Sequence, residues 1–577
     1  MRKFIIPLIF AAPLALPAQD LHKDITVEQE VTPSKREATI INILPSVTLP
    51  PVSSAPLTYS DKVVTTRVPN TISTLPPIAW SGDAPYRYRG YVVGAVGPWF
   101  DAAASLGYAF IDNQRTRLSA WGQFDYDIYR RGLRDDKSTR RRWHDSSASV
   151  GIDLHQAIGS KSTLDAGLEY AYGHNDFYAS DFASRFSQTV QRVNFLATFT
   201  SRHQGLEYDA RIGVRHFGFH DCDPAAVAGL GVRPQRQNRF LVSGAGKLET
   251  SDCSYLGLSV TADLLDTSRP YGQPLLPYWD IEDDMTLHGS GMTGVVSFTP
   301  YYYLAPSASF SARIGADIDI NVKGRKTLRW SPEVTLALTP SQIFGFEVKA
   351  KGGTRLNSLA DLYSGVTPYL NPLFAYASSH IPYDLQGRLT FGPFFNTTVE
   401  VFGGYAKADD WLMPVMSGLA PGGAIFRAMD VKGWRFGASL GYDNGSTWAV
   451  KATYTATPGK YKNLWYENRD RARHVVDAHL TLRPLDRLAV DLGFEFRGGR
   501  CLYGYGEPEN IGNLTYYPEE RLSLGAVADL TLGVNYALSR RLNIFARCEN
   551  LLSRTWYHLS PRPSQPANGL LGFAYKF

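Results

Sequence analysis

The sequence lacks several features that define common classes of protein. After residue 18, no apolar run approaches the roughly 18 continuous residues of a spanning helix, and the mean hydropathy is −0.20. The net charge of +5 is too small to indicate a nucleic-acid partner. No Walker, H-E-x-x-H or calcium-loop pattern occurs. We therefore expect no spanning helix, no nucleic-acid binding, no enzymatic activity, no catalytic residues and no cofactor.

The first 18 residues have the pattern of a secretory signal peptide. Basic Arg2 and Lys3 precede an apolar run over residues 4–16, and the segment closes on Leu16-Pro17-Ala18. A run of this length with a small residue at its end is typical of a cleaved export signal. We predict export, with a mature chain that begins near Gln19.

Residues 19–88 form a region of different composition, with nine prolines and a single glycine. Proline fixes φ, removes a backbone donor and favours extended geometry in the residue before it. The region is therefore predicted to be an extended periplasmic tether rather than a packed domain. Two interpretations stay open: a segment that reaches a partner, or a linker that lies along a surface.

From residue 89 onward, apolar and polar residues alternate. In RLSAWGQFDYDIY, Leu118, Phe124 and Tyr126 share one face, whereas Asp125 and Asp127 share the other. A strand places successive side chains on opposite sides of its sheet. Because the polar face carries charges, we expect it to face water. The apolar face would meet a second sheet in a sandwich, or lipid in an outer-membrane barrel.

The connections between the strands favour the barrel. About 22 strands are predicted between residues 89 and 577, and short connections alternate with long ones. The short ones include 112–114, 159–163, 339–342, 444–447 and 538–542, and the long ones include 130–145, 220–238, 355–379, 408–430 and 501–523. Short turns on one rim and long loops on the other are typical of transmembrane barrels. The predicted fold is an all-β, antiparallel transmembrane barrel with short periplasmic turns and long extracellular loops, located in the outer membrane.

The sequence GLLGFAYKF at 569–577 has the pattern of a closing strand for this barrel. Leu571, Phe573, Tyr575 and Phe577 share one face, and we expect the strand to pair with the first strand and remove the sheet edge. Aromatic rings are favoured at a membrane interface. Phe573, Tyr575 and Phe577 also resemble the C-terminal signal read by the outer-membrane assembly machinery.

The stretch NIFARCENLLSRTWYHLSPRPSQPANGLLGFAYKF resembles the last two strands of TonB-dependent receptors. The resemblance rests on Glu549, Asn550, Leu551, Leu552, Tyr557, Gly569, Leu570 and Phe577. It implies a 22-strand receptor barrel that takes part in transport of a solute across the outer membrane. Receptors of this family carry a folded plug of well over a hundred residues, whereas only 70 proline-rich residues precede the first predicted strand here. The chain therefore looks like a receptor barrel that lacks its usual plug.

A short segment in the tether is faintly similar to a TonB box. In ITVEQEV at 25–31, the β-branched Ile25, Thr26, Val27 and Val31 suit a segment that pairs as an added strand. The resemblance implies TonB as a partner. The alternative is a structural or assembly subunit of an outer-membrane complex that docks another periplasmic or outer-membrane protein through the tether, and a passive porin is a third possibility.

A 22-strand barrel encloses a lumen wide enough to need filling. The loops at 355–379, 408–430 and 501–523 are long enough to fold inward, and we expect them, with the tether, to restrict it. The basic loop RRGLRDDKSTRRRWHD at 130–145 has two interpretations: a solvated loop, or a segment that contacts the phosphates of outer-leaflet glycolipid, besides the lipid around the barrel.

Two weaker chemical candidates concern cysteine and histidine. The strand pattern places Cys222 at a long loop and Cys253 at a short turn, too far apart for a disulfide. A disulfide between Cys222 and Cys501 stays open. Cys548 is expected to face lipid. The cluster HFGFHDCD at 216–223 offers imidazole, thiolate and carboxylate groups. Because polar residues are expected where a strand meets a surface loop, we predict no metal site there.

Overall fold

The computed structural model describes residues 88–577, with gaps at 99–100, 134–136, 179–184, 204, 223–235, 269–290, 323–325, 367–377, 417–423, 461, 506–508, 512–513, 517–518 and 558–561. The signal peptide predicted over 1–18 lies outside the described residues, as does the tether predicted over 19–88 apart from Tyr88. Among the described residues, no helix is long and apolar enough to cross a membrane.

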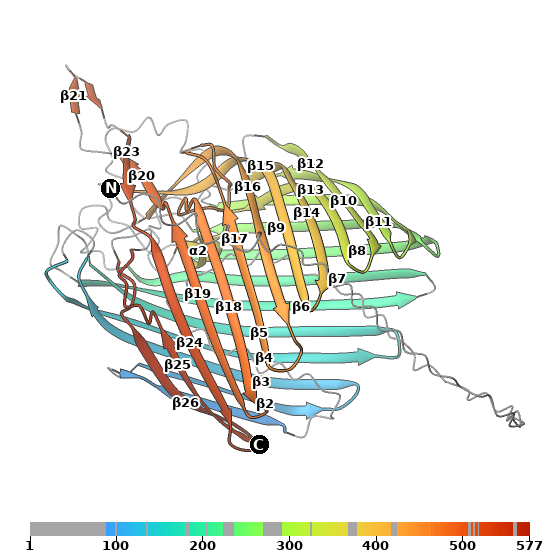
Figure 1. The fold of residues 1–577 in the computed structure, drawn as a ribbon. Helices are drawn as coiled ribbons and strands as arrows, with labels where there is room; N and C mark the ends of the chain where they lie inside the picture. Colours follow the sequence, from blue (N-terminus) through green and yellow to red (C-terminus); the bar gives the residue numbers. More distant parts are fainter. Residues whose placement is uncertain are drawn as a thin grey trace, which may run out of the picture. The chain divides into compact units, whose positions relative to one another are not determined.

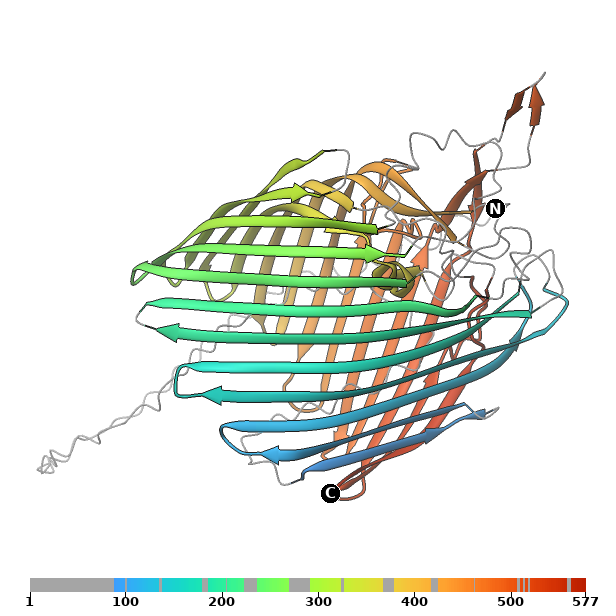
Figure 2. The same cartoon turned by 180° about the vertical axis from the view of Figure 1, so that it is seen from behind.

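Strands dominate the described chain and follow one another as an antiparallel meander (Figure 1 and Figure 2). The ring consists of β1 (Gly90–Val96), β2 (Ala102–Asp112), β3 (Thr116–Arg131), β4 (Arg141–Ile158), β5 (Ser162–Tyr178), β6 (Arg185–His203), β7 (Leu206–Cys222), β8 (Arg236–Ser251), β9 (Ser254–Thr267), β10 (Gly291–Ser307), β11 (Phe310–Asn321), β12 (Leu328–Ser341), β13 (Phe344–Leu356), β14 (Ser378–Phe394), β15 (Thr397–Met416), β16 (Ala424–Asp443), β17 (Trp448–Ala456), β18 (His474–Leu485), β19 (Leu488–Gly498), β24 (Val527–Ala537), β25 (Leu542–Glu549) and β26 (Asn568–Lys576). These 22 strands agree with the predicted number.

Four short strands and one helix are not members of the ring. Strand β20 (Cys501–Tyr505) pairs with β23 (Glu519–Ser523), and β21 (Glu509–Ile511) pairs with β22 (Leu514–Tyr516). All four belong to the connection between β19 and β24, which pair directly with each other in the ring. Helix α2 (Leu359–Val366) belongs to the connection between β13 and β14.

The ring closes where β26 pairs with β1 in an antiparallel register that runs from Tyr91↔Lys576 to Val96↔Leu571. This pairing confirms the predicted closing strand. Along β26, Leu571, Phe573 and Tyr575 are exposed, and the neighbouring Leu570 is buried. The alternation follows from the strand geometry, and closure leaves neither strand with an unpaired edge.

The outer face of the barrel is apolar and the inner face is polar. On β4, Val150 and Ile152 are 56% and 52% exposed, as expected for side chains that contact lipid. On β3, Asp125 and Asp127 point to the other side and are only 5% and 2% exposed. The charged face predicted from the sequence therefore lines the lumen, and the sandwich alternative is wrong.

Several strands extend further at the long-loop rim than the sequence suggested. The predicted loop at 130–145 is mostly strand, because β3 continues to Arg131 and β4 begins at Arg141. Tyr129 and Trp143 face each other across this pair with stacked rings 6.2 Å apart. Above the membrane both faces of a strand can be polar, so alternation fades while pairing continues. The stretch 408–430 is corrected in the same way by β15 and β16.

Candidate functional site in the barrel lumen

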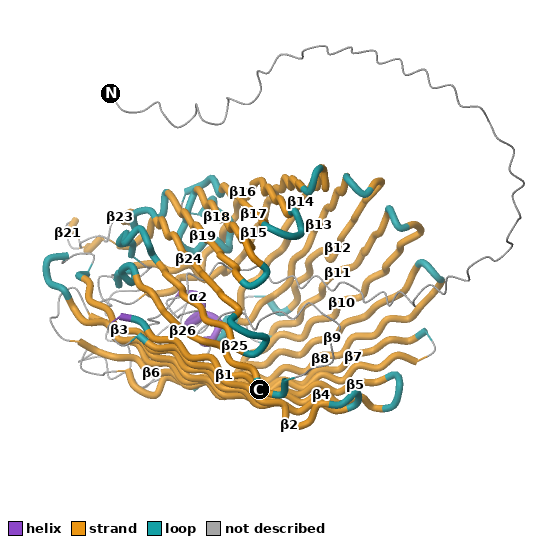
Figure 3. The backbone as a smooth tube through the Cα atoms, turned by 60° about the horizontal axis from the view of Figure 1, so that its bottom comes forward, coloured by secondary structure: helices purple, strands orange, loops and turns teal. Residues whose placement is uncertain are grey.

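Helix α2 lies inside the ring of strands (Figure 3). Its first turn is capped by Ser358, whose hydroxyl accepts a hydrogen bond from the backbone N–H of Asp361 at 3.1 Å. The N–H of Leu359 donates to the side-chain oxygen of Gln237 on β8 at 2.7 Å, and Gln237 in turn donates to Thr267 at 2.8 Å. The helix start is therefore held by buried groups of the barrel wall.

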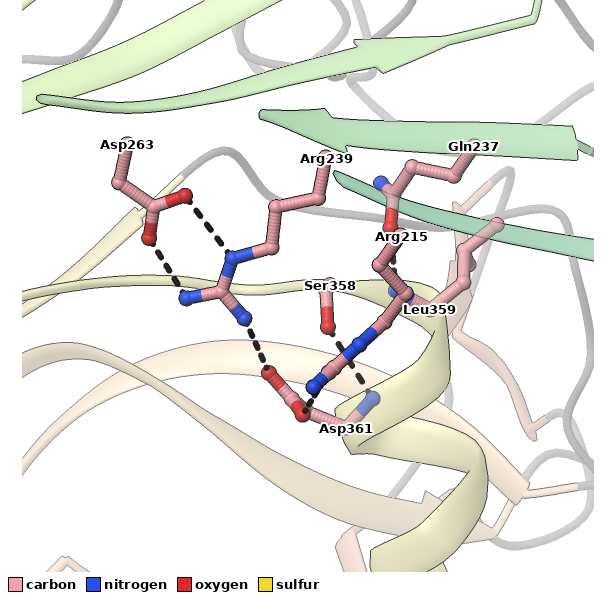
Figure 4. Close-up of polar contacts among 7 residues, drawn as sticks. All are labelled: Arg215, Gln237, Arg239, Asp263, Ser358, Leu359 and Asp361. Carbon is pink, nitrogen blue, oxygen red and sulfur yellow. Dashed lines mark hydrogen bonds and ion pairs between the residues drawn. The ribbon is translucent and has the colours of Figure 1, made fainter. Parts of the chain in front are cut away.

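The carboxylate of Asp361 contacts two arginines of that wall (Figure 4). Its Oδ1 accepts a hydrogen bond from the Arg215 guanidinium on β7 at 3.4 Å, and its Oδ2 accepts one from the Arg239 guanidinium on β8 at 3.2 Å. Arg239 also makes a two-pronged contact with Asp263 on β9, at 2.8 and 2.6 Å. A planar guanidinium matches a carboxylate in this way, so Asp263 fixes the orientation in which Arg239 meets the helix. We call Asp361, Arg215 and Arg239 the latch.

Several opposing effects act on the ionisation of Asp361. Burial raises the pKa of its carboxyl, and the hydrogen bond with Ser358 opposes this effect. The positive charges of Arg239, Arg355 and Arg215 lower the pKa further, and the net result lies below the usual value of 3.8. Asp361 is therefore a carboxylate at neutral pH.

A fourth arginine lies within the same electrostatic field. Burial, and then the positive charge of Arg355, lower the pKa of Arg469 to about 10, whereas Asp361 acts in the opposite direction. The latch region thus gathers four arginines around the carboxylates of Asp361, Asp263 and Glu467.

Apolar packing joins α2 to distant parts of the ring. Tyr363 accepts a hydrogen bond from Asn175 on β5 at 2.6 Å and packs against Phe217 and Phe219 of β7. The cluster around the helix consists of Val190, Phe217, Phe219, Leu359, Ala360, Leu362, Leu412, Leu502 and Leu524. It brings β6, β7, β15 and the β20–β23 hairpin together inside the barrel. Of the loops expected to fold inward, α2 and the β20–β23 hairpin contribute to this cluster, whereas β21 and β22 extend away from the ring (Figure 1).

The connection between β17 and β18 also folds inward. Leu464, Trp465 and Tyr466 join a cluster with residues of β15 and β16. The Tyr466 hydroxyl donates to Asp384 on β14 at 2.8 Å, and the Arg435 guanidinium lies 4.5 Å from the centre of the Trp465 ring. The alternation pattern of the sequence did not indicate that this connection enters the lumen.

The connection between β25 and β26 covers another part of the inner wall. Arg562 forms a buried ion pair with Asp145 of β4 and donates to the Tyr129 hydroxyl at 3.0 Å. The same hydroxyl donates to the backbone oxygen of Pro563 at 3.3 Å. Asp145, which the sequence placed at the end of an exposed basic loop, is instead a buried partner of this inner loop.

The residues singled out from the sequence have different outcomes. Ile25, Thr26, Val27 and Val31 lie outside the described residues. Phe573 and Tyr575 lie on the lipid-facing side of β26 and Phe577 follows it, also exposed; their role as an assembly signal stays a prediction. The latch residues were missed because Arg215, Arg239 and Asp361 are up to 146 residues apart in sequence and follow no spacing rule.

The cysteine and histidine candidates also have an outcome. Cys253 lies in the turn after β8, and Cys222 ends β7 at the opposite rim, as expected. Cys253, Cys501 and Cys548 are free, and the side chain of Cys222 lies outside the part of the chain that the structure describes. In HFGFHDCD, the His216 ring nitrogen lies 2.7 Å from the side-chain oxygen of Asn238.

Comparison with solved structures reveals similar barrels at very low sequence identity. A mutant form of the ferric enterobactin receptor PfeA from Pseudomonas aeruginosa, in complex with enterobactin, has a TM-score of 0.61 at 11% identity, covering 86% of this chain and 82% of that one. The siderophore receptor PirA from Acinetobacter baumannii has 0.61 at 10%, covering 86% and 81%. The iron transporter FrpB from Neisseria meningitidis has 0.61 at 11%, covering 85% and 81%. No protein-family model matches the sequence, and none of the curated proteins compared with it does.

These likenesses define the fold of the chain. It is a closed 22-strand antiparallel barrel, similar in fold to these receptors and this transporter, with an apolar exterior and a polar lumen. An exterior of this kind is stable only in lipid, and a closed antiparallel barrel that satisfies its own backbone is the β-structure that can span it. The chain is an outer-membrane β-barrel.

Proposed function

We propose that the chain is an outer-membrane transport receptor whose lumen is restricted by its own inward-folded loops. The latch is the observation that carries this proposal. A passive porin does not need a helix held across its lumen by a capped N-terminus, two arginines and an apolar cluster. A transporter needs such an element, because the route must be closed when no solute is present.

The solute class follows from the charges around the latch. Asp361 presents a carboxylate to Arg215 and Arg239, with Arg355 and Arg469 contributing positive potential. A solute that carries carboxylate or comparable anionic oxygen groups can offer the same chemistry to the same guanidinium groups. We propose that such a solute competes with Asp361 and thereby frees α2 from the wall.

The strength of the latch suits this exchange. The side chains of Arg215, Arg239 and Asp361 are 33%, 24% and 27% exposed, and partly exposed ion pairs contribute only about 0.2–1 kcal/mol each. A ligand that forms several charge-assisted hydrogen bonds can replace them. The similar solved structures are named as siderophore receptors and an iron transporter, which supports an anionic ferric chelate as the solute.

Energy for transport is proposed to come through the segment 25–31, which would pair with TonB as an added strand. Glycolipid phosphates are proposed to contact the basic residues between Arg130 and Arg142. Both proposals rest on the sequence alone. The alternative of an assembly subunit is not favoured by the latch, because docking a periplasmic partner needs no anion site at the extracellular side of the lumen.

A ligand titration tests the proposed function. The full chain in detergent is titrated with ferric enterobactin or ferric citrate, and tryptophan fluorescence is recorded. We expect saturable binding that weakens at least tenfold in Arg239→Gln. The control is Arg202→Gln, since Arg202 pairs with Glu249 at the short-turn rim. The proposal is wrong if neither chelate binds, or if both variants bind as the native chain does.

A further inference from the structure

A second cluster of ligand-type side chains lies on the outer side of the barrel, away from the latch. His144 belongs to β4, and His174 and Asp176 belong to β5. One imidazole nitrogen from each histidine and one carboxylate oxygen all lie within 4.8 Å of one another. The cluster shares no residue with the latch, and its chemistry does not depend on the proposed transport role.

The register of the two strands places these residues on one face. β4 and β5 pair without a shift from Ile158↔Ser162 to Asp145↔Asn175. Because side chains alternate, His144 shares a face with Val150, and His174 and Asp176 share a face with Tyr170. Val150 and Tyr170 are exposed on the lipid side. The cluster therefore lies on the outer wall, whereas Asp145 and Asn175 point into the lumen.

The cluster lies beyond the apolar band. His144 is six residues from Val150 along β4, which is about 20 Å of strand at about 3.3 Å per residue. With the usual tilt of roughly 40°, this distance raises the cluster about 15 Å along the barrel axis. His144 and His174 are half-buried there and Asp176 is buried, so the two imidazoles are the groups that an ion from the water above the lipid core would meet first.

Neighbouring groups orient the ligand atoms. The Nδ1 of His174 lies 3.0 Å from the Thr189 hydroxyl, and its Nε2 lies 3.6 Å from Oδ1 of Asp176. A hydrogen bond at one ring nitrogen fixes the tautomer and turns the other nitrogen toward a metal. The His144 ring packs 4.9 Å from Tyr126 and 5.1 Å from His174. The Asp176 side chain is 1% exposed, so its carboxylate is held in place.

We propose that His144, His174 and Asp176 bind one divalent transition-metal ion, with zinc, copper, nickel or cobalt as candidates. Two imidazoles and one carboxylate match the preferences of these ions and differ from the all-oxygen sites of calcium and magnesium. Small side-chain rotations bring the three atoms to the spacing of a tetrahedral site, with water as the fourth ligand. The bound ion joins β4 to β5 above the membrane.

The test uses the full chain without a histidine tag, purified in detergent and stripped with a chelator. Zinc chloride is titrated by calorimetry, and cobalt binding is followed by visible absorption. We expect one ion per chain, with tetrahedral cobalt bands. His174→Ala and Asp176→Asn are expected to weaken binding at least tenfold and to remove the bands.

His155→Ala is the matched control. His155 lies on the same strand as His144 and 2.6 Å from Asp165, and no third ligand-type side chain is grouped with this pair among the described residues. The control is expected to bind zinc as the native chain does. Folding of each variant is checked by its faster migration in gels without boiling.

A second variant keeps the test decisive. If His174→Ala does not fold, His144→Gln replaces it, since glutamine retains a polar group of similar size. The assignment is overturned if the native chain binds no ion, or if the folded cluster variants bind as tightly as the control.

Discussion

The ring of Phe577 occupies the space that a side chain at position 90 would need. A Cβ atom placed on Gly90 would lie 2.6 Å from two carbons of that ring. The backbones of the two residues also exchange hydrogen bonds of 2.9 and 3.0 Å. Gly90 and Phe577 therefore fit together at the seam where the barrel closes.

Substituting Gly90 by leucine is expected to impair closure. The new side chain and the Phe577 ring cannot both keep their places, so the ring must turn away from the seam and lose its contact with position 90. The control is Gly246→Leu, because a Cβ at Gly246 meets nothing within 4 Å. The fraction of heat-modifiable, folded barrel in outer-membrane preparations is measured. Equal fractions for the two variants would contradict the prediction.

Conductance should report the ionisation of Asp361. Its pKa in the latched state lies below 3.8, so the latch is strongest above that value and weakens as the pH falls through the lowered pKa. Planar-bilayer conductance is expected to stay constant from neutral pH downward and to rise only below 3.8. In Asp361→Asn it should be raised at all pH values, with no such step. A step that persists in this variant would assign the transition to another group.

The inward fold of the β17–β18 loop depends on Gly433. A Cβ there would overlap the backbone of Leu464, and backbone cannot move aside as a flexible side chain can. Gly433→Ala is expected to displace the loop and to make residues 457–473 sensitive to added protease in intact vesicles. Gly403→Ala is the comparison, since its nearest neighbours are 3.7 Å away. Protection of the loop in both variants would show that Gly433 is not needed.

The ion pair between Arg562 and Asp145 should be strongly coupled. Their side chains are 1% and 6% exposed, so Arg562→Gln leaves a buried carboxylate without its positive partner. Removal of one member of a buried pair costs about 3–5 kcal/mol. The double variant with Asp145→Asn is expected to lose less than the sum of the single variants when urea unfolding is measured in lipid vesicles. Additive losses would mean that the two side chains act independently.

The proposed TonB contact can be tested on the full chain in detergent. TonB is expected to be retained on the immobilised barrel and lost with Val27→Pro, because proline removes a donor from an added strand. Ile41 and Ile43 belong to the apolar stretch at 40–44, within the predicted tether but outside the segment 25–31. Substitutions at these two positions serve as controls. Retention of a different envelope protein that tolerates Val27→Pro but requires Ile41 and Ile43 would favour an assembly role instead.

Most of the barrel could be predicted because the alternation of apolar and polar residues that identifies each strand involves only residues close together in the sequence. Alternation in segments such as the one containing Phe124 and Asp125 indicates one face toward lipid and one toward water. This two-residue period can be recognised from neighbouring residues alone. The strand ends near Arg131 and Arg141 were misplaced for the same reason. Above the lipid the outer face becomes polar, as at Arg130 and Arg142, while the inner face carries Tyr129 and Trp143, so the local signal disappears although the hydrogen-bonded ladder continues.

The luminal contacts could be predicted only in part. Loop length indicated that 355–379 would fold inward, but the partners of Asp361 depend on which strands stand across the lumen. That arrangement is fixed by ring closure and not by any nearby residue. The metal-type cluster shows the same limit: the sequence drew attention to HFGFHDCD because its ligand-type residues are contiguous, whereas His144 and His174 meet only through strand pairing.

The apolar cluster around α2 also has a consequence for the order of events during biogenesis. Its members come from the β6–β7 hairpin on one side and from β15 and the β20–β23 hairpin on the other, and these two sides face each other only when the wall is complete. The strands can therefore enter the membrane as successive hairpins, but the lumen fills last. We expect a newly closed barrel to conduct ions until α2 docks against the β6–β7 wall.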